Sequence, residues 1–414
     1  MSEGVMTPAL ARIKEWLVYA LIFLFPVAGV SVRHWFSAIF VLLALISLWD
    51  LVRQWGKRPV LLREEKIWLW LCVVFFLSFL VSSWVNGWTQ QQNRALGVDV
   101  RYLLVVPLYL MLRHYTAAGR CLLAGMMVAA AVLAAQAYYD VEVLRLTRAQ
   151  GSYSPNLLGP VAALVVVWLL SSWKLCGKLR WLLPPLVLAA LWAVVMSGSR
   201  GAYIGLLAML LIWCGLFFKG WLRAPAFIAV LLLPVVAYHS FTSLAERVDV
   251  AVSEVNVYFE QLEQGEYESG GSINVRFEMW RAGWMAFKDA PLLGIGPNNY
   301  KETVRQYVGV NGLSEQVAQH GQAHSAYVDI LMARGLVGFL IFIVLLFYPL
   351  YFFMKTRQAS PATAIFGVVH IVGFAAFSLT DASPFDKGNF VAIYLLCMSI
   401  FLSRHMAAVK QRLV

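Results

Sequence analysis

Charge is scarce in this chain, and the sequence motifs of many soluble enzymes are absent. Only 13% of the 414 residues are charged, 61% are hydrophobic, and the mean hydropathy is +0.70. This composition excludes an ordinary soluble protein. The sequence has no phosphate-binding P-loop, no GxSxG serine and no Asp-x-Asp pair for a metal-bound sugar nucleotide. We therefore expect chemistry that needs no ATP, no metal and no cofactor.

Cysteines are also few. The five of them are isolated from one another, form no CxxC pair and avoid the longest polar segment. Such a distribution argues against both a disulfide framework and a zinc site.

About twelve long apolar stretches fill most of the chain, and each is long enough, or nearly so, to cross a bilayer as a helix. The fourth stretch is weak because Asp99 and Arg101 begin it and Pro107 interrupts it. In the tenth, Gly335 and Gly338 predict a break. We expect an all-α integral membrane protein with spans near 16–30, 34–52, 67–85, 99–113, 121–139, 157–173, 179–196, 201–218, 224–239, 326–353, 361–379 and 389–403.

The net charge of +11 comes mainly from short loops that alternate along the chain. Alternation of this kind is the positive-inside pattern, so the charge indicates topology and not a nucleic-acid partner. It predicts cytoplasmic termini and an even number of spans. The polar segment 240–324 then faces outward, and it holds six Lys and Arg against eleven Asp and Glu. We divide the chain into transmembrane helices over 1–239, a large periplasmic loop over 240–324, and further transmembrane helices with a cytoplasmic tail over 325–414.

The large loop is expected to be mainly helical. Apolar residues recur at helical spacing over Leu244–Leu262, which predicts an amphipathic helix lying against the bundle or the bilayer surface. A second helix is expected over Asn274–Lys288. A turn-rich segment, Gly294–Asn299, precedes a third helix near Tyr300–Val308.

Two arginines border this loop at the edge of the expected membrane region. Arg200 lies in the short connection after an apolar stretch, and Arg276 lies on the second loop helix. A guanidinium suits a phosphate group because its planar fork donates two hydrogen bonds and keeps its charge. An arginine that only reaches lipid headgroups is the alternative interpretation for Arg200. We expect both arginines to bind an anionic, lipid-linked substrate.

His324 ends the loop, immediately before an apolar stretch. With an ordinary pKa of about 6.5, an imidazole is mostly neutral at pH 7 and can accept a proton from a hydroxyl. A structural histidine is the alternative, and His320 is a second candidate for the same role. The two histidines together suggest a metal, but no carboxylate completes such a site, so we expect none.

Three further residues are weaker candidates. Arg148 lies in an outward loop and would extend the anion site. Arg281 follows Arg276 by five residues, so the two point to different sides of a helix. Asp381 would orient a base or bind sugar, although a solvated turn also explains it.

The order of these motifs resembles the O-antigen ligase and polymerase superfamily. The motifs are Ser199-Arg200-Gly201, then Arg276…Trp280…Ala290-Pro-Leu-Leu-Gly-Ile-Gly296, then His324-Ser-x-Tyr327…Gly335-Leu-Val-Gly338. The resemblance extends from about Arg148 to Gly338 and includes the single large loop between late spans. It adds Tyr327 as a substrate-binding candidate. In that family the histidine is commonly followed by asparagine, whereas this chain has Ser325.

The resemblance implies an inverting, GT-C-like membrane glycosyltransferase of lipopolysaccharide biosynthesis in the bacterial inner membrane. Its donor would be an O-antigen glycan on undecaprenyl pyrophosphate, and its acceptor a sugar hydroxyl of lipid A–core. Arg200 and Arg276, with Arg148, would hold the pyrophosphate at the periplasmic face. His324 would activate the acceptor hydroxyl.

Other functions stay open. O-antigen polymerases often have two large periplasmic loops, and protein O-oligosaccharyltransferases usually have additional C-terminal sequence. Both features favour a ligase here. A lipid or solute transporter is a different class, which intramembrane charges and two similar halves would indicate. We find few charges within the spans and no matching halves.

Overall fold

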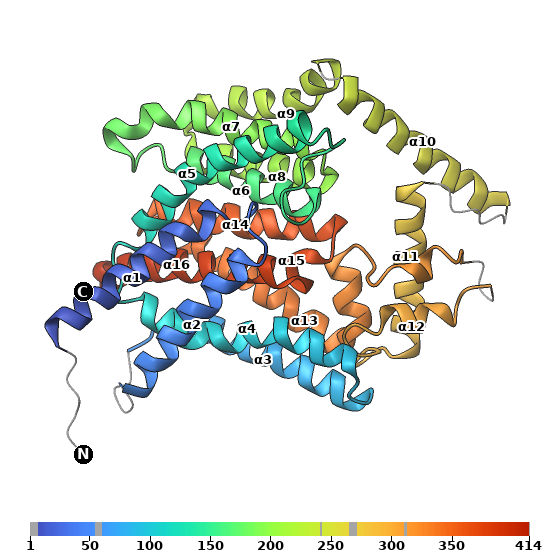
Figure 1. Cartoon of the computed structure of the whole chain (residues 1–414), viewed down its shortest axis with the longest axis horizontal. Coiled ribbons are helices and arrows are strands. Elements are labelled where there is room, and N and C mark those ends of the chain that lie inside the picture. The colour runs from blue at the N-terminus through green and yellow to red at the C-terminus, as the bar shows by residue number, and fades with distance from the viewer. Residues whose placement is uncertain (1–6, 54–59, 241, 265–270, 310–312, 414) are drawn as a thin grey trace.

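The computed structural model describes residues 7–53, 60–240, 242–264, 271–309 and 313–413. Over these ranges the regular structure is helical, with one isolated β-bridge and no strand (Figure 1). Ten helices in the described residues are long and apolar enough to cross a membrane. The expected class, an all-α integral membrane protein, is therefore confirmed.

Each of the twelve predicted stretches coincides with a helix. Eleven of these helices are α1 (Pro8–Val27), α2 (Trp35–Arg53), α3 (Arg63–Val85), α4 (Gln90–Leu112), α5 (Ala118–Tyr138), α6 (Pro155–Ser171), α7 (Leu183–Ser197), α8 (Arg200–Phe217), α9 (Arg223–Ser240), α14 (Pro361–Thr380) and α16 (Gly388–Leu413). A shorter helix, α15 (Ser383–Asp386), lies between α14 and α16 in the sequence. The twelfth is α13 (Ala326–Lys355). α6 has 17 residues, and together with α1 it lies outside the ten candidate spans.

α4 begins at Gln90, nine residues before the predicted start at 99. The Thr89 hydroxyl accepts a hydrogen bond from the Gln91 amide at 3.2 Å and caps the helix. The buried Gln92 amide donates to the Pro297 carbonyl at 3.1 Å. Asp99 forms a buried ion pair with Arg334. Tertiary partners therefore satisfy the polar groups that made this helix look weak in the sequence.

The long helix α13 is broken at Gly335, where φ is 61° and ψ is −168°. The turn-rich segment of the large loop binds this break through backbone hydrogen bonds. The Leu336 amide donates to the Pro291 carbonyl at 2.8 Å, and the Gly296 amide donates to the Ala333 carbonyl at 3.1 Å. The predicted break is confirmed at Gly335 but not at Gly338, where the backbone stays helical. It anchors the large loop to the bundle.

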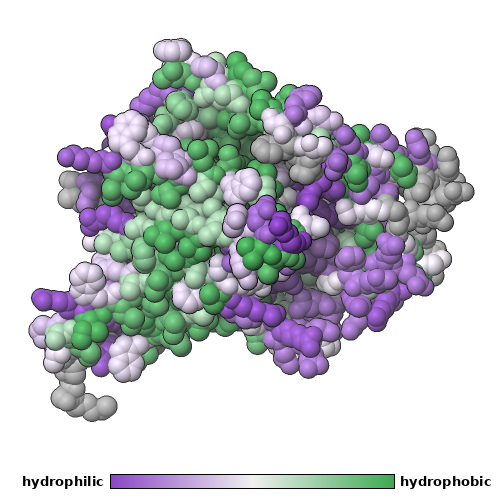
Figure 2. All heavy atoms as spheres, turned by 45° about the horizontal axis from the view of Figure 1, so that its top comes forward, coloured by the Kyte–Doolittle hydropathy of each residue, from purple (hydrophilic) through white to green (hydrophobic). Residues whose placement is uncertain are grey.

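The large loop contains α10 (Thr242–Gln264), α11 (Ser272–Asp289) and α12 (Tyr300–Arg305), close to the three predicted helices. These helices lie at the end of the bundle opposite the start of α1 and the end of α16 (Figure 1). Polar surface gathers over them, whereas apolar surface covers much of the bundle (Figure 2).

The predicted apolar stripe of the first loop helix is largely exposed on α10. Val248, Val252 and Phe259 are 41%, 55% and 54% exposed, and the side chains of Leu244 and Leu262 lie outside the described residues. Among the described residues, the main helix contacts of α10 are with its chain neighbours α9 and α11. Of the two predicted positions, the exposed stripe agrees with a bilayer surface better than with burial on the bundle.

Candidate active site at the loop end of the bundle

Four arginines surround a cavity of about 300 Å³ at the loop end of the bundle. We call it the arginine pocket. Its charged lining residues come from five segments. They are Arg148 in the loop before α6, Arg200 at the start of α8, Arg247 on α10, Arg276 on α11 and Asp381 immediately after α14. Segments separated by more than 200 residues in sequence therefore meet in one site.

The backbone of the turn between α7 and α8 accepts hydrogen bonds from two of these arginines. Arg148 donates from Nε to the Ser197 carbonyl at 2.8 Å and from Nη2 to the Gly198 carbonyl at 3.1 Å. Arg247 donates from Nη1 to the same Gly198 carbonyl at 3.1 Å. Gly198 has a φ of +53°, and a Cβ atom there would lie 1.9 Å from Arg247 Nη1. Only glycine fits this turn beneath two guanidinium groups.

The other two arginines meet across the junction of α8 and α11. Arg200 is the first residue of α8, and its Nη1 donates to the Ser272 hydroxyl at 3.1 Å. Ser272 is the first residue of α11, and Arg276 follows it by four residues on the same helix face. The N-terminal end of α11 is fixed by Glu254 of α10, which accepts a hydrogen bond from the Ile273 amide at 2.8 Å.

The arginine pocket is strongly positive. Burial lowers the pKa of Arg148 and of Arg276, and the neighbouring Arg200 guanidinium lowers both further. A guanidinium nevertheless stays protonated in proteins. Among the described residues that line the pocket, Asp381 is the only carboxylate. Four cations face one anion, so a bound anion such as phosphate would relieve their mutual repulsion.

His324 lies beside this pocket. The charges of Asp381 and Arg276 both act on its imidazole, and burial lowers its pKa from the usual 6.5. The neutral, proton-accepting form is therefore favoured. Its buried Nδ1 has no hydrogen-bond partner within the part of the chain that the structure describes. Within the described residues, no protein group therefore occupies that nitrogen.

Two hydrogen bonds fix the backbone of Ala323, the residue before His324. The Ala323 amide donates to Asp329 Oδ1 of α13 at 2.6 Å, and Trp280 Nε1 of α11 donates to the Ala323 carbonyl at 3.0 Å. His324 itself has a φ of +50°, which is uncommon for a residue with a side chain. These two contacts hold the histidine in a fixed orientation between α11 and α13.

Comparison with known proteins shows what this chain is similar to. A family model described as O-antigen ligase matches residues 185–343, the region that carries three of the four arginines and His324. This match supports the resemblance to the O-antigen ligase family over that region. Members of the family are glycosyltransferase-like enzymes of O-antigen processing. An uncharacterized protein of Haemophilus influenzae is 23% identical over 353 residues, which cover 82% of this chain and 86% of that protein.

Two of the weaker candidates lie apart from the arginine pocket. Arg281 is half-buried on α11 and is absent from the pocket lining. The Tyr327 hydroxyl donates to the Ala375 carbonyl of α14 at 3.0 Å, and its ring packs near Phe342. The Tyr327 contact indicates packing between α13 and α14.

The residues that follow and precede His324 are also placed by the structure. The Ser325 hydroxyl donates to the Ser378 carbonyl of α14 at 3.3 Å. Where the family commonly has asparagine, this chain therefore uses the side chain to join α13 to α14. His320 lies against His324, with ring centroids 5.5 Å apart.

Arg247 is the pocket residue that the sequence analysis missed. It lies one position before Val248 on α10, next to the apolar stripe of that helix. A basic residue beside an apolar stripe is the available signal, because the other charges of the helix are mostly acidic and lie elsewhere. That signal is weak in a helix whose stripe is exposed.

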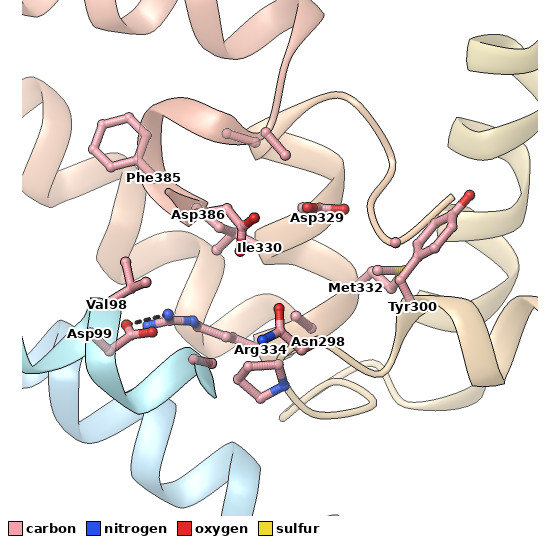
Figure 3. Close-up of a pocket in the computed structure, with 16 residues that line it drawn as sticks. Val98, Asp99, Asn298, Tyr300, Asp329, Ile330, Met332, Arg334, Phe385 and Asp386 are labelled. Carbon is pink, nitrogen blue, oxygen red and sulfur yellow. Dashed lines mark hydrogen bonds and ion pairs between the residues drawn. The ribbon is translucent and has the colours of Figure 1, made fainter. Parts of the chain in front are cut away.

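A second charged pocket lies close by, between α4, α13 and α15, and has a volume of about 50 Å³. We call it the acidic pocket, and it contains Asp99, Asp329, Asp386 and Arg334 (Figure 3). Each carboxylate has a partner within the protein. Asp99 pairs with Arg334, Asp386 pairs with Lys387 at 2.6 Å, and Asp329 accepts from the Ala323 amide.

Proposed function

We propose that this protein is an O-antigen ligase, which transfers an O-antigen glycan from undecaprenyl pyrophosphate to a sugar hydroxyl of lipid A–core. The observation that carries this proposal is the convergence of four guanidinium groups in one pocket, near a half-buried imidazole on which the charges of Arg276 and Asp381 act. The family match supports the class of reaction.

Arg200 and Arg276 hold the donor pyrophosphate. Arg148 and Arg247 already donate to the turn at Gly198, so they add charge and fix the wall of the pocket. Negative charge grows on the pyrophosphate as it leaves, and fixed guanidinium groups stabilise that charge most in the transition state. Because pyrophosphate is a good leaving group, no ATP is consumed.

An apolar groove of about 320 Å³ continues from the arginine pocket and supports a lipid-linked donor. It lies between α8 and α10 and shares Arg200 and Arg247 with the pocket. Its apolar wall includes Tyr203, Val252 and Val255. A polyprenyl tail in this groove would lead directly to a pyrophosphate at the arginines.

His324 serves as the general base. Its imidazole takes the proton from the acceptor hydroxyl while the acceptor oxygen bonds to C1 of the donor sugar. The bond between C1 and the pyrophosphate oxygen breaks on the opposite face, and the electron pair leaves with the pyrophosphate. Attack from the side opposite to the leaving group inverts C1. Asp381, whose charge reaches the imidazole, stabilises the imidazolium that forms.

We further propose that residues 240–324 face the periplasm and that both termini face the cytoplasm of a bacterial inner-membrane protein. The alternating basic loops support this orientation. The position of α10–α12 opposite the start of α1 and the end of α16 supports it as well. Residues 1–239 and 325–414 then supply the membrane-spanning parts.

Reconstitution tests this function. Purified protein in liposomes is mixed with undecaprenyl-pyrophosphate-linked glycan and lipid A–core, and glycan attached to the core is measured by gel shift and mass spectrometry. We expect one glycan chain on each modified core molecule. Chain growth when a second donor replaces the core would instead make the protein a polymerase. Absence of any transfer would refute both enzymes.

A further inference from the structure

A second cavity adjoins the arginine pocket on the side away from α10. It has a volume of about 530 Å³, and we call it the lateral pocket. Its polar lining comes from the start of α2 and the residue before it, α4, the segment that leads into α6, and the segment from α15 into α16; it includes Arg101, Tyr153, Asn156, Ser383, Lys387 and Asn389. Asn156 and Phe390 line both cavities. A shared wall therefore separates the two pockets.

The lateral pocket contains a cation whose charge is not neutralised by an ion pair. Arg101 donates from Nη1 to the Gly97 carbonyl, one turn earlier on α4. Its buried Nε has no hydrogen-bond partner, and no ion pair to it occurs, among the residues that the structure describes. Lys387, the other cation, is balanced by Asp386 at 2.6 Å. The surplus charge of the pocket therefore belongs to Arg101.

The backbone of α16 makes room for this guanidinium. A Cβ atom on Gly388 would lie 2.8 Å from Arg101 Nη2. The guanidinium therefore lies against the backbone of Gly388, the first residue of α16. Its open side then faces a cavity rich in hydroxyl and amide groups. This combination of one fixed guanidinium with many neutral hydrogen-bonding groups suits a phosphorylated sugar.

The two pockets meet at the segment after α14, where Asp381 of the arginine pocket accepts a hydrogen bond at 2.8 Å from the amide of Ser383, which lines the lateral pocket. The charges of both pockets act on His324. The groups whose charges act on its imidazole are Asp381 and Arg276 of the arginine pocket, Lys387 of the lateral pocket, and the neighbouring His320. A base that activates an acceptor must lie near the acceptor, and the donor phosphate must leave on the opposite side. The two cavities provide these two sides.

We propose that the lateral pocket binds a phosphorylated sugar of the acceptor glycolipid, with Arg101 as the phosphate-binding residue. This inference rests on the proposed glycosyl transfer and assigns the acceptor to a site of its own. Arg101 acts on binding of the acceptor and not on the chemical step. Donor recognition stays with the arginine pocket.

Steady-state kinetics with Arg101→Gln test the assignment. The KM for phosphorylated acceptor should rise about tenfold or more, because a charge-assisted hydrogen bond is lost. The KM for the donor should stay unchanged, which also shows that the variant is folded. Arg94→Gln is the matched control, because Arg94 is an exposed arginine on the same helix seven residues earlier and lines neither pocket. It should behave as the wild type.

Removal of the acceptor phosphates with phosphatase identifies the group that Arg101 binds. The wild type should then lose its advantage over Arg101→Gln, so that both use the dephosphorylated acceptor equally. Gly388→Ala keeps the charge but displaces the guanidinium, and it should raise the acceptor KM in the same direction. An equal loss with both acceptors would overturn the proposal, as would an unchanged acceptor KM in Arg101→Gln.

A phospholipid headgroup is the other source of such a phosphate. Liposomes with and without phosphatidylglycerol distinguish the two sources at constant acceptor concentration. We expect the effect of Arg101→Gln to be the same in both. If it disappears without phosphatidylglycerol, the pocket binds lipid and the proposal is wrong. A wild-type protein that transfers glycan to no acceptor would refute the enzyme function itself, an outcome that differs from all of these.

Discussion

The arginine pocket and the acidic pocket lie at the same end of the bundle and both contain several charges, but their charges are balanced differently. In the acidic pocket, two of the three carboxylates, Asp99 and Asp386, pair with the cations Arg334 and Lys387, and Asp329 accepts a hydrogen bond from the neutral Ala323 amide. In the arginine pocket, four guanidinium groups face Asp381 alone, and their hydrogen bonds run to neutral carbonyl and hydroxyl oxygens.

This difference separates structural from functional charge. A buried charge with an internal partner needs nothing from outside, and removing the partner costs stability. A cluster of like charges without internal compensation is unfavourable by itself and becomes favourable when an anion binds. The acidic pocket therefore belongs to the scaffold, whereas the arginine pocket is suited to a phosphate ligand. Mutations in the acidic pocket should therefore affect mainly stability, and mutations in the arginine pocket mainly activity.

The largest expected effect tests the base beside the arginine pocket. His324→Ala should lower the rate of glycan transfer by about 10²–10⁴-fold, because proton removal from the acceptor loses its positioned base. The protein should still insert into the membrane and accumulate. His320→Ala is the matched control and should lose far less activity. Transfer in vitro at the wild-type rate by His324→Ala would contradict the base assignment.

Substitutions in the acidic pocket should lower the stability of the folded protein. Asp99→Asn leaves Arg334 buried without its carboxylate, and we expect a loss of about 3–5 kcal/mol in the free energy of unfolding. Thermal unfolding in detergent measures this loss. The double variant Asp99→Leu/Arg334→Met replaces the pair with apolar groups and should recover most of the stability. If Asp99→Asn is as stable as the wild type, the comparison between the pockets fails.

Substitutions in the arginine pocket should instead lower the rate of glycan transfer. Arg200→Lys and Arg276→Lys keep the charge but lose the planar fork, so kcat/KM for the donor should fall by about 10- to 100-fold. Unfolding temperatures should change little, because neither arginine has an ion-pair partner among the described residues. Arg281→Lys, on α11 but outside the pocket, is the comparison variant. Wild-type kinetics in both pocket variants would argue against a phosphate clamp.

Much of this architecture follows from patterns that the sequence shows directly. Apolar stretches fix the helices, since only a helix satisfies its own backbone in a membrane. Arg148, Arg200, Arg276 and Asp381 were predicted from isolated motifs, and the fold brings all four to one cavity. The order of motifs indicated a resemblance to the O-antigen ligase family, and the match to residues 185–343 supports it.

The remaining features depend on tertiary contacts that no local pattern encodes. Arg247 enters the site only because α10 crosses the turn at Gly198. α4 begins early because Gln92 and Asp99 find partners on segments more than 200 residues away. Arg281 and Tyr327 belong to the same motifs as the pocket residues, but the directions of their helices place them elsewhere. Spacing along the chain cannot separate these cases.

The smallest expected effect is a shift in the pH dependence of kcat/KM. Because burial lowers the pKa of His324 below 6.5, the neutral base should persist into mildly acidic solution, and kcat/KM should fall only below that pH. Asp381 raises this pKa, so Asp381→Asn should move the acid limb to still lower pH. Arg276→Lys keeps the neighbouring positive charge and should leave the limb in place while lowering the rate. pH–rate profiles of the three proteins measure these shifts. An acid limb above pH 6.5, or one that Asp381→Asn does not move, would place the titrating group outside the arginine pocket.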